Sequence, residues 1–152
     1  MAIDRRFIGF VSAPRSTQID RGMLRLFAKA TGESNPVYFD DAAAVAAGYP
    51  GIPAPPTYAI VLFSGAPAVG SSLEDLGVDE RDVLHGEQSY RHHRMMFAGD
   101  QITLTTTTSD IYARKGGALE FIVYDTTAVN QHGQLCTEMR SVLVVRHGAL
   151  PA

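Results

Sequence analysis

The sequence contains a single cysteine, Cys136, and no cluster of basic residues longer than the stretch Arg91–Arg94. One cysteine excludes an intrachain disulfide bond and fits a reducing compartment. Cys136 stands in a strand-like run without the spacing of metal ligands, so a buried structural thiol is expected there. The formal net charge of -3 and the scarcity of basic clusters predict that the chain does not bind nucleic acid.

Charged residues are absent from Ala42 to Leu73, which makes a membrane span the first alternative to consider. Prolines break this run into pieces too short to cross about 30 Å of hydrocarbon. They stand at Pro50, Pro53, Pro55, Pro56 and Pro67. The N-terminal stretch MAIDRRFIGF lacks the apolar core and the cleavage site of a signal peptide. Together these features predict a cytoplasmic protein that does not associate with membranes.

The remaining composition is that of an ordinary globular protein. The chain has 152 residues, of which 45% are hydrophobic, and its mean hydropathy is near zero. This length is enough to bury a core, and the chain contains no repeat, low-complexity stretch or linker. We therefore expect one domain spanning residues 1–152.

The first half of the chain predicts three helices. The first begins after Thr17 as N-cap and ends at Gly32, because apolar residues recur at helical spacing between them. These residues are Ile19, Met23, Leu26, Phe27 and Ala30. A short helix over Asp40–Ala47 is closed by Gly48. The third helix begins near Pro56, and its run TYAIVLFSG is apolar on all sides, which predicts burial.

From Val83 onward the pattern changes to strands. The strand-like runs are VLHGEQSYRHH, QITLTTTTSDIYA, ALEFIVYDTTAVN and QLCTEMRSVLVVR, separated by FAGD, RKGG and QHG. The last two runs carry apolar residues on both faces, as central strands covered by a helix do. An antiparallel sheet wrapped around one buried apolar helix is the hotdog architecture. The sequence therefore predicts a single hotdog fold of the α+β class.

Several stretches together carry a resemblance to a known family. FAKATGESNPVYFDDAAAVAAGYPGIPAPPTYAIVL, the strand HGEQSY, the turn AGD and the final RSVLVVR cover nearly the whole chain. The chain resembles the MaoC-like hydratase/dehydratase family, and within it the N-terminal-type, FAS1-like dehydratase domain. It is similar to the substrate-holding subunits of heterodimeric (3R)-hydroxyacyl dehydratases. The resemblance implies (R)-specific hydration or dehydration of a thioester on coenzyme A or acyl carrier protein, with no cofactor and no metal.

The catalytic positions of that family are altered in this chain. Catalytic members carry Gly-Asp-x-Asn-Pro-(aliphatic)-His, whose Asp and His hold one water between them as base and acid. Aligned on Asn35-Pro36, this sequence has Glu33 at the Asp position and Tyr38 at the His position. Glu33 could still act as a base and Tyr38 as a proton donor. The alternative is that Tyr38 only packs and Glu33 begins a capping interaction.

The resemblance also implies where substrate lies. Asn35 and Pro36 belong to the substrate-side loop, and the thioester carbonyl sits at the start of the buried helix. That start is Ala54-Pro55-Pro56-Thr57-Tyr58, whose two prolines remove two N–H donors and leave Thr57 and Tyr58 as candidates. Ala54 could line the acyl or pantetheine channel. In the strand HGEQ, His85 and Gln88 are candidates next to the site.

Four functions compete at this point. The chain could hold an acyl thioester while a MaoC-like partner supplies the catalytic Asp and His, the two sheets being joined at an edge. It could be a homodimer that catalyses with Glu33 and Tyr38. It could also be a hotdog module that binds an acyl thioester without catalysis. A hotdog thioesterase is the fourth, and the absence of an acid between Ala54 and Leu73 argues against it.

Overall fold

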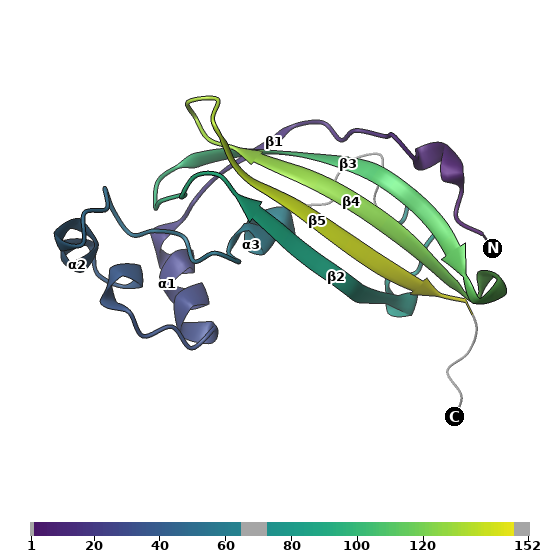
Figure 1. Ribbon diagram of the computed structural model, residues 1–152, viewed down its shortest axis with the longest axis horizontal. Coiled ribbons are helices and arrows are strands. Elements are labelled where there is room, and N and C mark those ends of the chain that lie inside the picture. The colour runs from purple at the N-terminus through teal and green to yellow at the C-terminus, as the bar shows by residue number, and fades with distance from the viewer. Residues whose placement is uncertain (1, 65–72, 148–152) are drawn as a thin grey trace.

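The computed structural model describes residues 2–64 and 73–147. Within this part the chain forms one curved five-stranded sheet, with three helices gathered at one end of it (Figure 1). The α-helices are α1 (Arg21–Ala30), α2 (Asp41–Ala46) and α3 (Ala59–Ser64). The strands are β1 (Arg15–Gln18), β2 (Val83–His92), β3 (Gln101–Arg114), β4 (Leu119–Val129) and β5 (Leu135–Arg146). Short 3-10 turns are η1 (Arg5–Phe7), η2 (Pro36–Tyr38), η3 (Glu80–Asp82) and η4 (Lys115–Gly117).

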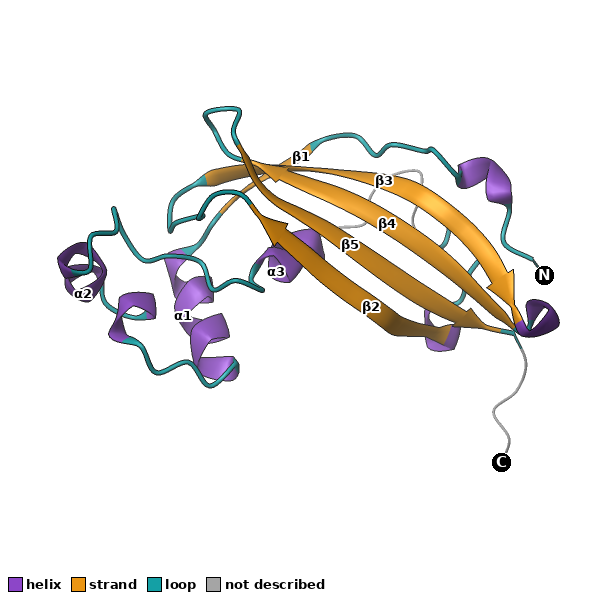
Figure 2. Cartoon of the chain, in the orientation of Figure 1, coloured by secondary structure: helices purple, strands orange, loops and turns teal. Residues whose placement is uncertain are grey.

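The sheet has the strand order β1-β3-β4-β5-β2, and every neighbouring pair is antiparallel. The four strands predicted from Val83 onward are confirmed, and β4 and β5 lie inside the sheet as predicted. Antiparallel neighbours need only short connections, which the turns after β3 and β4 provide. The long strand β2 forms one edge, and the short strand β1 forms the other (Figure 2).

The prediction that the first helix starts after Thr17 is wrong. Thr17 lies in β1, where it pairs with Ile102 of β3. The helix begins later because Asp20 is the N-cap, and its carboxylate accepts a hydrogen bond of 2.8 Å from the N–H of Met23. An N-cap carboxylate satisfies an N–H that has no partner inside the helix and also favours the positive helix end.

The predicted inner face of this helix also needs correction. Leu24 and Ala28 are fully buried and Phe27 packs against the core, whereas Met23 and Leu26 are 43% and 59% exposed. The buried stripe thus follows the spacing i, i+3, i+4 from Leu24. Gly32 ends the segment as predicted, with a positive φ of 76° that glycine adopts without strain.

The helix α2 matches its prediction, because Asp40 caps it through the N–H of Ala43. The buried third helix is confirmed as α3, but it begins at Ala59, three residues after the predicted start near Pro56; Ala59 and Leu62 are buried. The guanidinium of Arg15 in β1 donates to the carbonyls of Leu62 and Phe63. Cations are favoured at a helix C-terminus, so this contact fastens α3 to the sheet edge. The rest of the predicted apolar run, from residue 65 to 72, lies outside the described residues.

The core consists of two clusters of buried residues on the sheet. One cluster lies at the helical end and joins α1 and α3 to β3, β4 and β5, with Leu24, Tyr58, Leu62 and Met139 among its members. The other lies toward the opposite end and includes Ile3, Ile111 and Ile122. Cys136 is fully buried in the first cluster, as predicted, and burial raises the pKa of its thiol.

A β-bulge at Gly86 interrupts the pairing of β2 with β5. His85 pairs with Leu143, and Glu87 pairs with Val142, so one residue is extra on the β2 side. A Cβ atom on Gly86 would lie 2.7 Å from Cγ2 of Val144 and 3.2 Å from the carbonyl oxygen of Val142. Only glycine allows the backbone to approach β5 this closely.

We expect Gly86→Ala to lower the free energy of unfolding by about 1–3 kcal/mol, because the added methyl overpacks the contact with β5. Urea unfolding measures the change. Gly51→Ala is the matched control, because a Cβ there meets nothing within 4 Å. That control should leave stability unchanged or raise it by up to about 1 kcal/mol. Equal stability of the two variants would contradict the close approach at Gly86.

Candidate functional site

The motif loop Gly32–Asp40 connects α1 to α2 at the helical end of the sheet (Figure 2). It contains η2, which Asn35 caps by accepting a hydrogen bond of 3.2 Å from the N–H of Val37. Pro36 occupies the first turn of η2, where a missing N–H costs nothing. Asn35 and Pro36 therefore set the shape of the loop, and their predicted contact with substrate stays a prediction.

Glu33 turns its carboxylate back onto its own loop. Oε1 accepts hydrogen bonds from the N–H groups of Ser34 and Asn35, at 2.8 and 2.9 Å. Both donors are exposed backbone groups that start a new turn, so the carboxylate caps this turn as an acid caps a helix. Of the two interpretations of Glu33, the structure thus favours the capping interaction.

Tyr38 is partly buried beside Glu33. Burial raises the pKa of the Tyr38 hydroxyl above 10, and the Glu33 carboxylate and Tyr49 raise it further. A phenol with a raised pKa keeps its proton near neutral pH, so Tyr38 can donate a hydrogen bond there but cannot act as a base. At the His position of the family motif, this chain therefore has a hydrogen-bond donor and no base.

The start of α3 offers few backbone donors for a thioester oxygen. Pro55 and Pro56 have no N–H, the N–H of Ala54 donates to Met96 at 2.8 Å, and that of Tyr58 donates to Pro55 at 2.9 Å. Within the described residues, the N–H of the exposed Thr57 makes no hydrogen bond. Of the two predicted donors, Thr57 and not Tyr58 is therefore free to meet a substrate.

Tyr58 serves the core instead of the surface. Its side chain is 2% exposed and meets the ring of Phe27 edge-on, with 5.4 Å between ring centroids. Burial raises the pKa of its hydroxyl, and Asp20 adds to the effect. Ala54 is partly buried and packs against the same cluster. Direct contact of Tyr58 with substrate is thus disfavoured, whereas Ala54 keeps an open side.

An aromatic contact joins the segment after α2 to the β2–β3 connection. Tyr49, which contributes to the raised pKa of Tyr38, lies 6.3 Å from Phe97 between ring centroids. Phe97 forms an isolated bridge with Pro53, and the N–H of Ala98 donates to Ile52 at 2.9 Å. Glu33, Tyr38 and the residues before α3 therefore belong to one region of the molecule.

The two candidates on β2 lie on the same face of the sheet. The bulge places His85 opposite Leu143 and Gln88 opposite Ser141, two residues of one face of β5, whereas Glu87 lies opposite Val142. His85 and Glu87 are thus separated and do not form an acid–base pair. Gln88 accepts a hydrogen bond of 2.5 Å from the Ser141 hydroxyl, and its buried Nε2 has no partner among the described residues.

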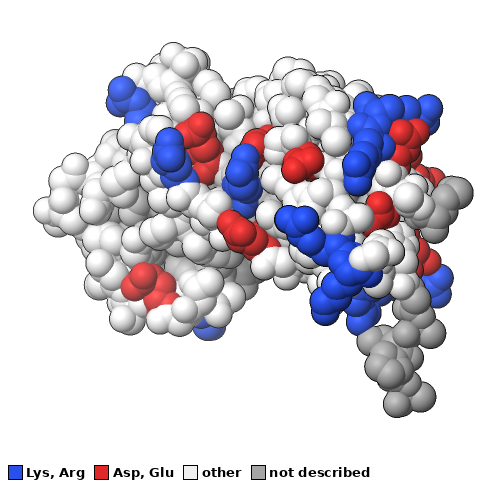
Figure 3. Space-filling view, turned by 45° about the vertical axis from the view of Figure 1, so that its right-hand side comes forward, with Lys and Arg blue, Asp and Glu red and all other residues white. Residues whose placement is uncertain are grey.

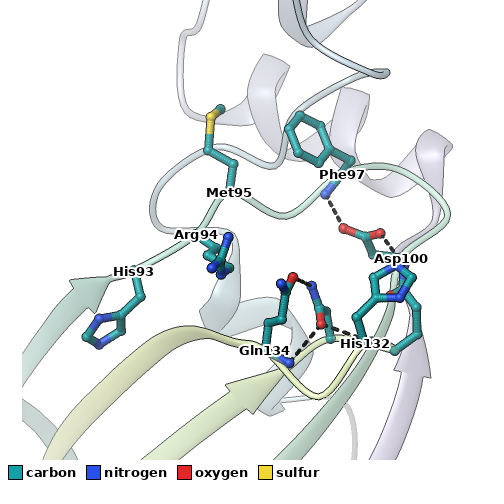
Figure 4. Close-up of a pocket in the computed structure, with 9 residues that line it drawn as sticks. His93, Arg94, Met95, Phe97, Asp100, His132 and Gln134 are labelled. Atoms are coloured by element: carbon teal, nitrogen blue, oxygen red, sulfur yellow. Dashed lines mark hydrogen bonds between the residues drawn. The ribbon is translucent and has the colours of Figure 1, made fainter.

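Two hollows open on the described surface. The first, of about 430 Å³, lies between the β2–β3 connection and the β4–β5 hairpin and is lined by His93, Arg94, Met95, Phe97, Asp100, Asn130, Gln131, His132 and Gln134 (Figure 4). The second, of about 440 Å³, includes the buried Glu120, which accepts hydrogen bonds from the N–H of Ile3 and from His147. From the sequence, the β2–β3 connection and the β4–β5 hairpin around the first hollow are predicted only as turns.

Acidic and basic side chains are interspersed over the face shown in Figure 3, and neither sign forms a continuous band there. No helix in the described part of the chain is long and apolar enough to span a bilayer. Within residues 2–64 and 73–147, no three His, Cys, Asp or Glu side chains gather as a metal ion would require.

The curved antiparallel sheet with its buried apolar helix defines a hotdog fold, as solved structures confirm. A C-terminally truncated HadBC complex, a (3R)-hydroxyacyl-ACP dehydratase of Mycobacterium tuberculosis, matches with a TM-score of 0.78 and 22% identity over 91% of this chain and 96% of that chain. The ChsH1–ChsH2 complex of the same organism matches with a TM-score of 0.67 and 25% identity over 91% of this chain and 86% of that chain.

The family follows from the sequence match. The model of the FAS1-like dehydratase domain region matches residues 6–139. A UPF0336 protein of Saccharopolyspora erythraea is 35% identical over 96% of this chain and 93% of its own length. The chain belongs to the FAS1-like dehydratase domain family, which confirms the resemblance and supports hydratase or dehydratase chemistry in general.

Replacing Glu33 by Gln tests the geometry of the altered pair. The substitution removes a negative charge that raises the pKa of Tyr38, so we expect that pKa to fall while staying above 10 because burial remains. Titration of the Tyr38 ring signals by NMR measures the change. Asp40→Asn removes another carboxylate of the loop and should leave the pKa of Tyr38 unchanged. An unaltered titration in Glu33→Gln would show that the two groups do not interact.

Proposed function

We propose that this chain is the substrate-holding subunit of an (R)-specific hydratase/dehydratase acting on an enoyl or 3-hydroxyacyl thioester of coenzyme A or acyl carrier protein. The catalytic acid and base then come from a MaoC-like partner subunit. The observation that carries the proposal is the Glu33 carboxylate, whose Oε1 accepts the N–H groups of Ser34 and Asn35. Because two backbone N–H groups donate to Oε1, this oxygen is less available to take a proton from a substrate or water.

Three features support a division of labour between two chains. Glu33 caps the loop, Tyr38 keeps its proton, and the prolines before Thr57 remove donors that would stabilise an enolate-like oxygen. The loop keeps its form, since Asn35 and Gly32 fulfil the turn roles of the family motif. A subunit that positions substrate without transferring protons needs the shape of the loop and not its acid and base.

The edge strand β2 supports the presence of a partner. It has ten residues, of which seven are exposed, and it pairs on one side only with β5 within the described residues. A long exposed edge presents unpaired N–H and C=O groups on which another sheet can continue. The HadBC and ChsH1–ChsH2 structures are complexes by name. A heterodimer is the arrangement we propose, and the lone Cys136 supports its location in the cytoplasm.

A self-sufficient homodimer is the second candidate, because Tyr38 can still donate a proton and its pKa responds to Glu33. In that case Glu33 would turn away from Ser34 and Asn35 and serve as base. A non-catalytic module that binds acyl thioesters is the third. The same set of assays distinguishes all three.

We expect the purified chain alone not to hydrate crotonyl-CoA or longer trans-2-enoyl-CoA substrates. Mixed with the product of a neighbouring gene that carries Gly-Asp-x-Asn-Pro-x-His, it should raise the hydration rate above that of the partner alone. Absorbance of the enoyl thioester follows the reaction. Binding of thioesters without turnover with any such partner would favour the module.

In the active mixture, Glu33→Gln and Tyr38→Phe should each change the rate by less than about threefold, because a lost general base or acid costs about a hundredfold or more. Glutamine keeps an oxygen that can accept the N–H groups of Ser34 and Asn35, so the loop is preserved. The matched controls are substitutions of the partner's motif Asp and His, which should abolish the reaction. Activity of the chain alone that disappears in Glu33→Gln would establish the homodimer.

A further inference from the structure

The hollow between the β2–β3 connection and the β4–β5 hairpin is open to solvent and lined mainly by polar side chains. Its volume of about 430 Å³ is within the range of small-molecule sites. Figure 4 shows Arg94 inside it, between Met95 and Gln134, with Asp100 and His132 on the far wall. The segment that carries Arg94 and the hairpin are far apart in sequence and lie side by side here.

Arg94 is the permanently charged cation of this hollow. Its guanidinium forms no ion pair with any residue in 2–64 or 73–147, unlike Arg140, which holds Asp125 at 2.7 Å. The carboxylate that shares the hollow is Asp100, and both of its oxygens accept hydrogen bonds. Oδ2 accepts from the N–H of Phe97 at 2.8 Å, and Oδ1 accepts from Nε2 of Gln131 at 2.9 Å. Arg94 therefore remains available to an anion.

The hairpin adds neutral donors, and its side-chain amide oxygens each accept a hydrogen bond already. Oδ1 of Asn130 accepts the N–H groups of His132 and Gln134, both at 3.0 Å, and Oε1 of Gln134 accepts from Asn130 at 3.2 Å. The amide nitrogen of Gln134 is left as a donor. Nε2 of His132 lies 3.4 Å from Nε2 of Gln131; where that amide donates to it, the proton of the neutral ring is on Nδ1 and is available to a ligand. A guanidinium, an imidazole N–H and an amide N–H together suit a phosphate group.

This hollow adjoins the candidate thioester site. Phe97, which lines it, contacts Tyr49 and bridges to Pro53, and the neighbouring Met96 accepts the N–H of Ala54. Thr57 follows a few residues later. A ligand with a phosphate at one end and a thioester at the other could therefore lie along one surface.

We propose that the hollow binds the phosphate of the phosphopantetheine arm, which coenzyme A and acyl carrier protein share, with Arg94 as its ionic contact. This inference rests on the proposed function, because it assigns one end of the same thioester substrate. It makes the phosphate, and not only the acyl group, a determinant of recognition by this chain.

The test compares two saturated thioesters that differ only in the phosphate: butyryl-phosphopantetheine and butyryl-pantetheine. Calorimetric titration of the full chain, alone and with the catalytic partner, gives the dissociation constants. Arg94→Gln should raise the constant for the phosphorylated ligand about tenfold, as loss of a charge-assisted hydrogen bond does, and leave the other unchanged. The difference should shrink with added salt.

Arg91→Gln is the matched control, because Arg91 is exposed three positions earlier and does not line the hollow. It should alter both constants by less than about twofold, as expected for a screened surface charge. Equal unfolding midpoints of the two variants exclude a folding defect. Titrations with butyryl-CoA and with a butyrylated carrier protein show which carrier supplies the phosphate. Weaker binding of both by Arg94→Gln would assign the contact to the phosphopantetheine arm that they share, and weaker binding of one would assign it to that carrier.

An equal loss for both butyryl ligands, or no loss in Arg94→Gln, would overturn this inference and leave the proposed function intact. A wild-type chain that binds the two ligands equally would also overturn it. Failure of the wild-type chain to bind any thioester, with or without partner, would instead overturn the proposed function and this inference together.

Discussion

Burial of the charge-free segment Ile52–Leu62 against the sheet is the constraint on which the rest of the structure depends. Ile52, Tyr58 and Ala59 are almost completely removed from solvent. Apolar burial stabilises the folded state by about 25 cal/mol per Å². A segment without charged side chains gains this stabilisation without the cost of burying a charge. Phe27 of α1 packs against the same cluster, and the backbone pairing of 52–54 with 96–98 holds the segment in place.

The same constraint places the site. Because Tyr58 is anchored in the core, Thr57 is held at the surface directly before α3. Because Ile52 and Ala54 pair with Ala98 and Met96, the β2–β3 connection lies beside the segment that precedes α3. The fold thus brings the N–H of Thr57, the motif loop and the hollow around Arg94 to one end of the molecule. The loop keeps the geometry of the family motif, while the Glu33 carboxylate caps a turn. This combination fits a chain that holds substrate for a catalytic partner.

Much of the fold could be predicted from the sequence, because strand alternation, helix caps, apolar runs and turn residues are local signals. The four long strands follow from the first and last of these signals, and α2 and the buried α3 follow from the caps and the apolar run. β1 could not, since a strand of only four residues, Arg15–Gln18, is stabilised by its register with β3 and not by its own pattern. The helix start was misplaced because Thr17 and Asp20 are both good caps, and only the pairing of Thr17 with Ile102 decides between them.

The site was predictable in outline and not in chemistry. The motif frame gave the positions of Glu33 and Tyr38, but the direction of a flexible Glu side chain depends on the donors around it. Strict strand alternation would put His85 and Glu87 on one face, but the residue inserted at the Gly86 bulge puts them on opposite faces. The hollow around Arg94 joins two connections far apart in sequence, so no local pattern reveals it.

The central claim is that the Glu33 carboxylate belongs to the loop and not to the reaction. A crystal structure of the chain with its partner and a bound unreactive acyl thioester tests it most directly. We expect Oε1 of Glu33 to keep its contacts of 2.8 and 2.9 Å to the N–H groups of Ser34 and Asn35, with the partner's acid and base at the reacting carbons. A Glu33 carboxylate turned to a water at the β-carbon of the acyl group would contradict it.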